Sequence, residues 1–303
     1  MFPPRTPRFD AFIEPARAYP QIWRLCAAIA IIAVCYFSFT LLVFFFVGVI
    51  QVATGIDFQL LGAAAPKFDS PYAMLALLVT FAGVTLGVWL AVRLLHKRGL
   101  LTVFGPNLKV LWRQASKTAH IIVPLFTFFL VLNVIFNPPV SHVEFFRWAL
   151  WLPLALPLLL IQTSAEEILF RGYLMQQLAA RFSSRWVWMV LPSVAFGLMH
   201  YNPAELGSNV WLVVIDTAIV GIIAADLTAR SGTLGPAITF HFFNNLFAMF
   251  LMSVDGSMIG LALYVTPYTA ADTETLRSLL LVDIVFNLVG YLIYARIMTR
   301  RGL

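Results

Sequence analysis

Charged residues and cysteines are scarce in this chain of 303 residues. Only 11% of the residues are Asp, Glu, Lys or Arg, against roughly 25% in a typical soluble domain. The two cysteines, Cys26 and Cys35, lie in the same apolar stretch, so they supply neither a disulfide framework nor the close pairs of a zinc site. So little charge excludes an ordinary soluble domain.

Hydrophobic residues make up 61% of the chain and aromatic residues 15%, and the mean hydropathy is +0.87. Crossing about 30 Å of hydrocarbon takes roughly 20 apolar residues in a helix. A transmembrane β-barrel has short alternating segments instead of continuous apolar runs. The sequence therefore predicts an all-α, polytopic membrane helix bundle. We expect about eight transmembrane helices, near 25–50, 72–92, 119–136, 148–180, 186–201, 210–228, 234–252 and 279–297.

Basic residues are distributed unequally between the two sides of this predicted bundle. One side collects most of them, whereas the other has only Lys67, Arg147 and Arg277. Because short cytoplasmic loops are enriched in Lys and Arg, we expect both termini to be cytoplasmic. A bacterial cytoplasmic membrane is the predicted location. The net charge of +6 follows from these helix flanks, so no nucleic-acid partner is predicted.

The chain is predicted to be a single integral membrane domain over residues 1–303, in which residues 1–24 form a cytoplasmic leader. The leader mixes Pro, Arg, Asp and Glu without helical periodicity. We expect it to be mobile or to lie at the level of the lipid headgroups.

Ionisable residues inside membrane segments cost roughly 2.5–3.5 kcal/mol each on insertion scales, so each calls for a reason. The fourth predicted segment contains Glu166 and Glu167, followed by Arg171. Glu167 and Arg171 are four positions apart, which predicts an ion pair on one face of the helix. Glu166 is then left for another partner.

Two histidines follow on later segments, in the patterns Phe196…His200 and His241…Asn245. A carboxylate, two imidazoles and an amide can polarise a water molecule and stabilise an oxyanion. They could equally bind a metal ion. Alone, the Glu-Glu-Arg cluster fits a structural ion pair or the charge relay of a transporter as well as catalysis.

These patterns, EExxxR, FxxxH and HxxxN/D in that order, resemble the CPBP family of intramembrane proteases, the CAAX prenyl protease 2 and lysostaphin-resistance type. The resemblance covers residues 148–250, the expected catalytic core. It implies that Glu166, helped by His200, activates the attacking water, and that His241 and Asn245 hold the oxyanion. It also implies that Glu167, Arg171 and Phe196 shape the site or position the substrate.

The implied activity is that of an intramembrane endopeptidase acting on a membrane-tethered protein or peptide, of the CAAX type or another. We expect catalysis that requires no metal; the alternative is zinc or another divalent metal, with Glu166, His200 and His241 as candidate ligands.

Asp216 and Asp226 raise the possibility of an aspartyl protease, but they share one helix and lack a GxGD sequence, so we expect structural roles. The alternative function is a non-proteolytic membrane protein of the same fold, such as an immunity factor, scaffold or transporter. The sequence indicates no oligomeric state.

The depth of each residue in the membrane gives a further expectation. At 1.5 Å per residue, Glu166 and His200 lie about 24 Å and about 20 Å from the cytoplasmic ends of their helices, so these two can meet. His241 lies only about 10 Å from the start of its segment. The seventh segment must therefore begin deeper, and we expect Gly235 and Pro236 to form non-helical backbone there.

Overall fold

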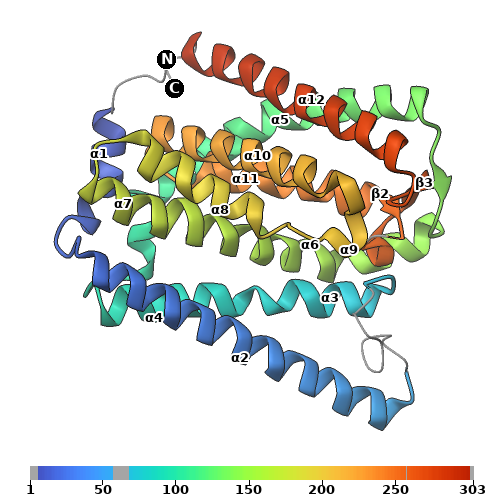
Figure 1. The fold of residues 1–303 in the computed structure, drawn as a ribbon, viewed down its shortest axis with the longest axis horizontal. Coiled ribbons are helices and arrows are strands. Elements are labelled where there is room, and N and C mark those ends of the chain that lie inside the picture. Colours follow the sequence, from blue (N-terminus) through green and yellow to red (C-terminus); the bar gives the residue numbers. More distant parts are fainter. Residues whose placement is uncertain (1–5, 57–67, 257, 301–303) are drawn as a thin grey trace.

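The computed structural model of the chain describes residues 6–56, 68–256 and 258–300. Six helical segments in these ranges are long and apolar enough to cross a membrane. Most of them run along the long axis of the molecule (Figure 1). The predicted all-α membrane bundle is therefore confirmed. The six segments are Ile22–Thr54, Pro71–Leu94, Leu108–Phe136, Phe145–Arg181, Pro203–Ser231 and Thr273–Met298.

The predicted count of eight is not confirmed, because two of the predicted spans are shorter helices. The predicted span 186–201 is a helical segment only from Trp186 to Leu198, about 20 Å long at 1.5 Å per residue. The predicted span 234–252 consists of a helix of 11 residues and a six-residue continuation. Both carry residues of the candidate site.

The elements are labelled in chain order. The helices are α1 (Pro7–Ile13), α2 (Ile22–Thr54), α3 (Pro71–Thr80), α4 (Ala82–Leu94), α5 (Leu108–Phe136), α6 (Phe145–Glu167), α7 (Met175–Arg181), α8 (Leu191–Leu198), α9 (Pro203–Leu206), α10 (Val210–Ser231), α11 (Gly235–Asn245) and α12 (Thr273–Arg300). In the part of the chain that the structure describes, three short strands, β1 (Val140–Ser141), β2 (Met252–Asp255) and β3 (Tyr264–Thr269), form a small sheet at one end of the bundle. Its order is β1-β3-β2, with β1 antiparallel and β2 parallel to β3.

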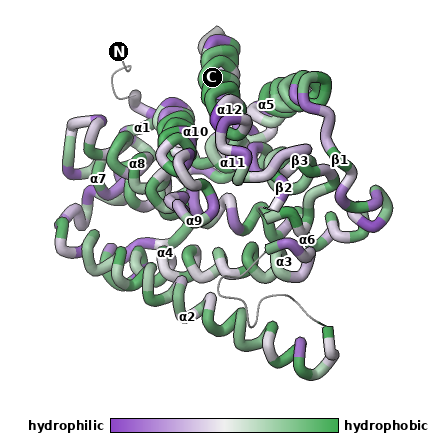
Figure 2. Tube along the Cα trace, turned by 45° about the vertical axis from the view of Figure 1, so that its right-hand side comes forward, coloured by the Kyte–Doolittle hydropathy of each residue, from purple (hydrophilic) through white to green (hydrophobic). Residues whose placement is uncertain are grey.

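The outer helices carry apolar side chains into the surroundings of the protein. Figure 2 shows hydrophobic residues along α2, α5 and α12. Val52 is 85% exposed and Phe136 is 77% exposed, and many other large apolar side chains on these helices are also exposed. Apolar exposure on this scale marks a surface in contact with lipid. The chain is an integral membrane protein.

Within the described residues, three π-helical segments interrupt or extend the bundle helices. They are Ile168–Leu174, between α6 and α7, Trp186–Val190, before α8, and Leu246–Leu251, after α11. A π-helical turn widens the helix and redirects the following side chains, and such turns are frequent at functional sites. Glu166 and Glu167 immediately precede the first segment, and Asn245 immediately precedes the last.

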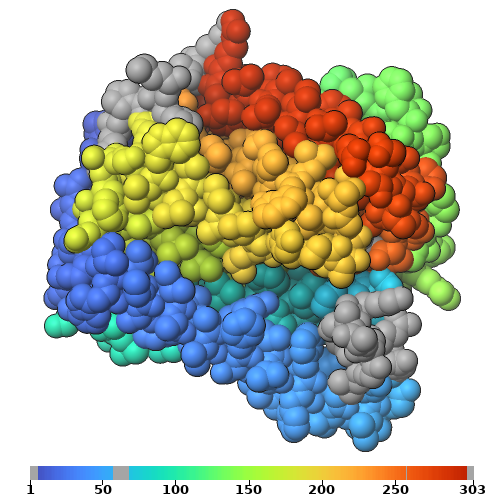
Figure 3. Space-filling model, in the orientation of Figure 1, coloured from blue at the N-terminus to red at the C-terminus, as the bar shows by residue number. Residues whose placement is uncertain are grey.

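The described part of the leader is folded, so the expectation that it is mobile is wrong for these residues, whereas its level relative to the lipid headgroups stays a prediction. Thr6 caps α1 by accepting a hydrogen bond from the backbone N–H of Phe9. Phe9 and Phe12 are buried, and the ring of Phe9 lies 4.7 Å from that of Trp188. Figure 3 shows the blue N-terminal segment against the yellow region of α7 and α8. The leader therefore contributes to the hydrophobic core.

The start of α11 differs from the prediction. Gly235 and Pro236 are the first residues of the helix, and residues 232–234 form the bend before it. A Cβ atom on Gly235 would lie 2.4 Å from the carbonyl oxygen of Leu111 in α5. The N–H of Leu234 donates to the carbonyl of Phe104 at 3.0 Å. Non-helical backbone does precede α11, but it lies before Gly235, where the loop ahead of α5 covers it.

Candidate functional site

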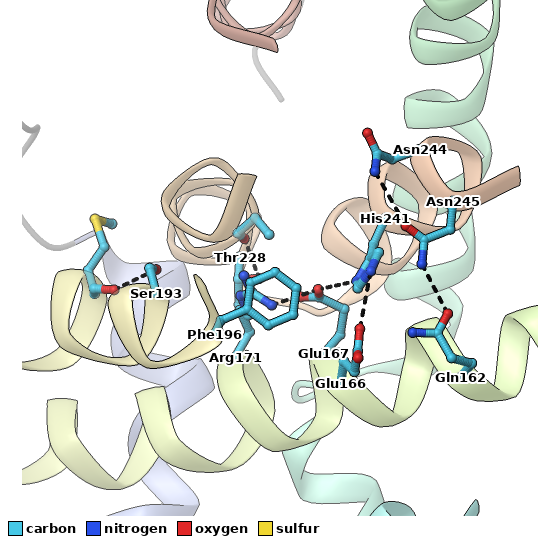
Figure 4. A network of polar contacts seen from close by, with 12 residues as sticks. Gln162, Glu166, Glu167, Arg171, Ser193, Phe196, Thr228, His241, Asn244 and Asn245 are labelled. Atoms are coloured by element: carbon cyan, nitrogen blue, oxygen red, sulfur yellow. Dashed lines mark hydrogen bonds and ion pairs between the residues drawn. The ribbon is translucent and has the colours of Figure 1, made fainter. Parts of the chain in front are cut away.

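A buried carboxylate joins two helices at the centre of the site. Oε1 of Glu167, the last residue of α6, accepts a hydrogen bond from Nη1 of Arg171 at 2.8 Å and one from Nδ1 of His241 in α11 at 2.8 Å. Figure 4 shows these three side chains in a row. All three are almost fully buried. The predicted ion pair between Glu167 and Arg171 is therefore present, and it extends to His241.

Glu166 lies on the other side of the same imidazole. Its Oε2 is 3.3 Å from Nε2 of His241, and its side chain is 16% exposed. Two consecutive carboxylates thus face the two nitrogens of one ring. The sequence led us to expect Glu166 beside His200, whereas its direct partner in the structure is His241. The reason is the packing of α11 against α6, which places His241 at the level of Glu166.

The charges of this cluster can be balanced. A carboxylate oxygen only accepts hydrogen bonds, so Nδ1 of His241 carries the proton that it donates to Glu167. Nε2 lies 3.3 Å from the carboxylate of Glu166, so one further proton, placed on either group, would turn this contact into a hydrogen bond. With the positive charge of Arg171, the four groups then sum to zero. Neutrality lowers the large cost of burying ions away from water.

Arg171 is held from several sides. Its guanidinium carbon lies 4.6 Å from the ring centroid of Phe196, a cation–π contact. A Cβ atom on Gly221 of α10 would lie 3.1 Å from Nη2 of Arg171, so the glycine makes room for this group. Because Arg171 is only 2% exposed, the structural part of its expected role is favoured over contact with a substrate.

Phe196 links the two imidazoles of the site. Its ring centroid is 5.0 Å from that of His200 and 5.8 Å from that of His241. Nδ1 of His200 lies 3.0 Å from the carbonyl oxygen of Phe196, an acceptor, so Nδ1 is the donor. In neutral His200 this leaves Nε2 with a free lone pair. His200 is partly exposed. Within the described residues, no hydrogen bond or ion pair joins it to Glu166.

Asn245 belongs to a chain of amides that the sequence did not reveal in full. Its Nδ2 donates to Oε1 of Gln162 at 3.0 Å, and its Oδ1 accepts from Nδ2 of Asn244 at 3.3 Å. Gln162 is buried in α6, one helical turn before Glu166. Gln162 was not predicted from the sequence. A polar residue in an apolar helix, four positions before Glu166, could have indicated that it belongs to the site.

Within the described ranges, no group of three or more His, Cys, Asp and Glu side chains is placed to hold a metal ion. The three candidate ligands, Glu166, His200 and His241, do not converge on one point where a metal ion could bind. Glu166 and Glu167 occupy both nitrogens of His241, and His200 stands apart behind the ring of Phe196.

The two aspartates of α10 have side-chain partners of their own. Asp226 pairs with Arg230 and accepts a hydrogen bond from the hydroxyl of Tyr291. Asp216 accepts a hydrogen bond from Nδ2 of Asn287 at 3.4 Å. These contacts join α10 to α12 and fit the structural roles expected for both aspartates.

The fold and the site together define an integral membrane protein with a buried acid–imidazole centre. Residues 147–247 match the family model described as type II CAAX prenyl endopeptidase Rce1-like. This stretch contains Glu166, Glu167, Arg171, Phe196, His200, His241 and Asn245, and the match confirms the resemblance seen in the motifs. The description of this family names a CAAX prenyl endopeptidase.

The chain is also similar to a curated protein of Bacillus subtilis (strain 168), named "Uncharacterized protein YyaK". The two are 29% identical over 177 residues, which are 57% of this chain and 59% of that protein. The chain thus spans about six tenths of the length of this relative. No solved structure matches the chain.

Proposed function

We propose that the protein is an intramembrane endopeptidase that hydrolyses a peptide bond in a membrane-associated protein or peptide, of the CAAX type or another. The observation that carries this proposal is the position of His241 between Glu166 and Glu167, inside the stretch that matches the endopeptidase family. An ionisable cluster buried in a membrane protein is costly and marks a functional site.

In the proposed reaction, Glu166 and His200 activate the attacking water. Glu166 is the more exposed of the two glutamates, and neutral His200 keeps Nε2 free to accept a proton. The water oxygen forms a bond to the carbonyl carbon while its proton passes to this pair. The C–N bond then breaks, and the same proton goes to the leaving amine.

His241 and Asn245 form the proposed oxyanion site. With a proton on Nε2, which faces Glu166, His241 can share this hydrogen with the oxygen on which negative charge develops. The Nδ2 of Asn245 gives one hydrogen to Gln162, so the second remains for the oxyanion. The fixed donors require no rearrangement during the reaction, which is why such sites lower the barrier.

The substrate is proposed to reach the site from the bilayer, in a bacterial cytoplasmic membrane with both termini of the enzyme in the cytoplasm. The unequal distribution of basic residues supports this orientation. The preferred mechanism needs no metal. Zinc content and chelator sensitivity of the purified protein test this part, and stoichiometric zinc lost together with activity would overturn it.

The proposal is tested by comparing the membrane proteomes of cells that produce the wild-type protein, Glu166→Gln or Glu274→Gln. Glu274 is an exposed carboxylate on α12, 83% exposed, and serves as the matched control. Cleavage fragments should be formed with the wild-type protein and the control but be lost with Glu166→Gln, by about 10²–10⁴-fold if Glu166 is the base. Equal fragments with a correctly inserted Glu166→Gln protein would sink the mechanism.

The same cluster supports a second candidate function, that of a transporter or another non-proteolytic protein of this fold. A proton held between Glu166 and His241 is the kind of group that proton relays use. Proton flux through wild-type proteoliposomes that is lost in Glu166→Gln, without any peptide cleavage, would favour this candidate.

A further inference from the structure

A second cavity, with a largely apolar lining and two arginines, lies away from Glu166, where the leader meets the bundle. It is a pocket of about 370 Å³, within the range of roughly 300–1,000 Å³ of small-molecule sites. Its walls come from α1, α5, α10 and α12. Figure 1 shows α1 at the same end of the molecule as the last turns of α12. The lining includes Arg8, Gln114, Leu227, Arg230, Tyr294 and Met298.

Two arginines give this pocket a positive charge. Arg230 donates from Nε to Asp226, and a guanidinium has five N–H donors, so others remain for a ligand. Arg8 makes no ion pair with any residue of the described ranges. The charge of Asp226 offsets that of Arg230, and Arg8 is left unbalanced. The pocket therefore favours an anion.

The uncharged polar groups of the lining already have partners in the protein. Gln114 donates to the carbonyl of Ser231 and accepts from the hydroxyl of Thr233. The hydroxyl of Tyr294 is bonded to that of Thr118 at 2.9 Å. Recognition of an anion is thus left to the two guanidinium groups, whereas Leu227 and Met298 offer an apolar wall beside them.

We propose that this pocket binds the phosphate group of an anionic phospholipid from the leaflet at the basic end of the bundle. Guanidinium groups match phosphate oxygens in pairs. Basic pockets between transmembrane helices on the cytoplasmic side suit anionic headgroups, and the apolar wall suits the adjoining hydrocarbon of a lipid. A free phosphate ion carries the same negative charge but has no hydrocarbon to pack against the apolar wall.

The bound lipid holds the leader onto the bundle. Arg8 belongs to α1, and the hydroxyl of its neighbour Thr6 donates to the carbonyl of Ala229 at 3.3 Å, next to Arg230. A phosphate between Arg8 and Arg230 adds a second link between α1 and α10. Binding should therefore raise the unfolding temperature of the full chain.

The test uses the purified full chain in a neutral detergent, with dioleoyl phosphatidylglycerol, dioleoyl phosphatidylcholine or inorganic phosphate added. Thermal unfolding gives the apparent affinity, and native mass spectrometry gives the number of lipids retained. The phosphatidylglycerol should bind saturably and raise the unfolding temperature, whereas the phosphatidylcholine should not. Arg8→Gln should lose about 10- to 100-fold in affinity, the size of one charged hydrogen bond.

Arg296→Gln is the matched control, because Arg296 is an exposed arginine on α12 that does not line the pocket. It should bind the lipid as the wild-type protein does. Arg230→Lys keeps a positive charge beside Asp226 and should weaken binding without unfolding the protein. Equal affinity in Arg8→Gln, or equal binding of phosphatidylcholine, overturns the proposal. Saturable stabilisation by inorganic phosphate alone, lost in Arg8→Gln, overturns the assignment to a lipid.

Discussion

His241 donates a hydrogen bond to Glu167 at 2.8 Å across 74 positions of sequence, and this contact fixes how the site is built. It sets the orientation of the imidazole, so that the opposite nitrogen faces Glu166. One carboxylate therefore holds the ring while the other stays partly exposed. Adjacent glutamates in the sequence have acquired different environments and, in the proposed mechanism, different tasks.

The two histidines should differ in what their loss does to the protein. His200→Gln should lower peptide cleavage by about 10²-fold or more but leave the unfolding temperature close to that of the wild type. The side chain of His200 is partly exposed, and its one hydrogen bond within the described residues is to the carbonyl of Phe196 in the same segment. His241→Gln should lower both cleavage and stability, because it leaves two carboxylates without their shared partner. Measuring thermal unfolding together with cleavage separates a loss of activity alone from a loss of both activity and stability. A strongly destabilised His200→Gln protein would contradict the proposed catalytic role of His200.

Glu167 should matter for folding more than its neighbour Glu166. Replacing Glu167 by Gln leaves the buried guanidinium of Arg171 without its counter-ion, which costs about 3–5 kcal/mol when a buried pair is broken. Equilibrium unfolding in mixed micelles of detergent and sodium dodecyl sulfate measures the loss.

The double variant Glu167→Gln/Arg171→Met provides the control for this interpretation. It removes the unpaired charge and should recover part of the stability lost in Glu167→Gln, as expected for a coupled pair. If Glu167→Gln is as stable as the wild type, the ion pair does not hold this part of the fold.

The close contact at the start of α11 should be sensitive to a single methyl group. Gly235→Ala places a Cβ atom against the backbone carbonyl of Leu111, at 2.4 Å before relaxation, and overpacking of this kind costs about 1–3 kcal/mol. It should also shift His241 and lower cleavage. Gly99→Ala is the control, because a Cβ atom there meets no atom within 4 Å. Equal thermal stability of the two variants would show that α11 can begin elsewhere.

His96 should make the stability of the protein depend on pH. Burial, and to a smaller extent the charge of Arg98, lower the pKa of His96 from 6.5 to about 4. The folded state therefore keeps His96 neutral, with Nε2 accepting from the hydroxyl of Tyr173 at 2.8 Å and Nδ1 donating to the carbonyl of Tyr19. Because the unfolded chain takes up this proton first, the contribution of His96 is complete above pH 6.5 and is lost as the pH falls toward about 4.

The measurement is the unfolding temperature between about pH 7.5 and about pH 4, a range that covers both the ordinary and the lowered pKa of His96. The wild-type protein should lose more stability over the range than His96→Gln. His142→Gln, at an exposed position, should follow the wild type. Parallel curves for the wild type and His96→Gln would rule out this linkage.

Much of the fold, and the list of candidate site residues, could be predicted from the sequence itself. Long apolar runs require helices, because a backbone in lipid must satisfy its own hydrogen bonds. The pair formed by Glu167 and Arg171 is equally local, since residues four apart on a helix are neighbours whatever surrounds them. The residues of the three motifs could be named for the same reason: their chemistry stands out against an apolar background.

Only the tertiary structure decided which of these residues meet. The partner of Glu166 depends on how deep α11 begins and how it is rotated, and both depend on the contact between Gly235 and Leu111. The tertiary structure also decided that the leader is folded, because Phe9 and Phe12 are buried by packing against helices that are distant in the sequence. Periodicity describes one helix at a time, whereas contacts such as that between His241 and Glu167 are made between helices and depend on their relative position.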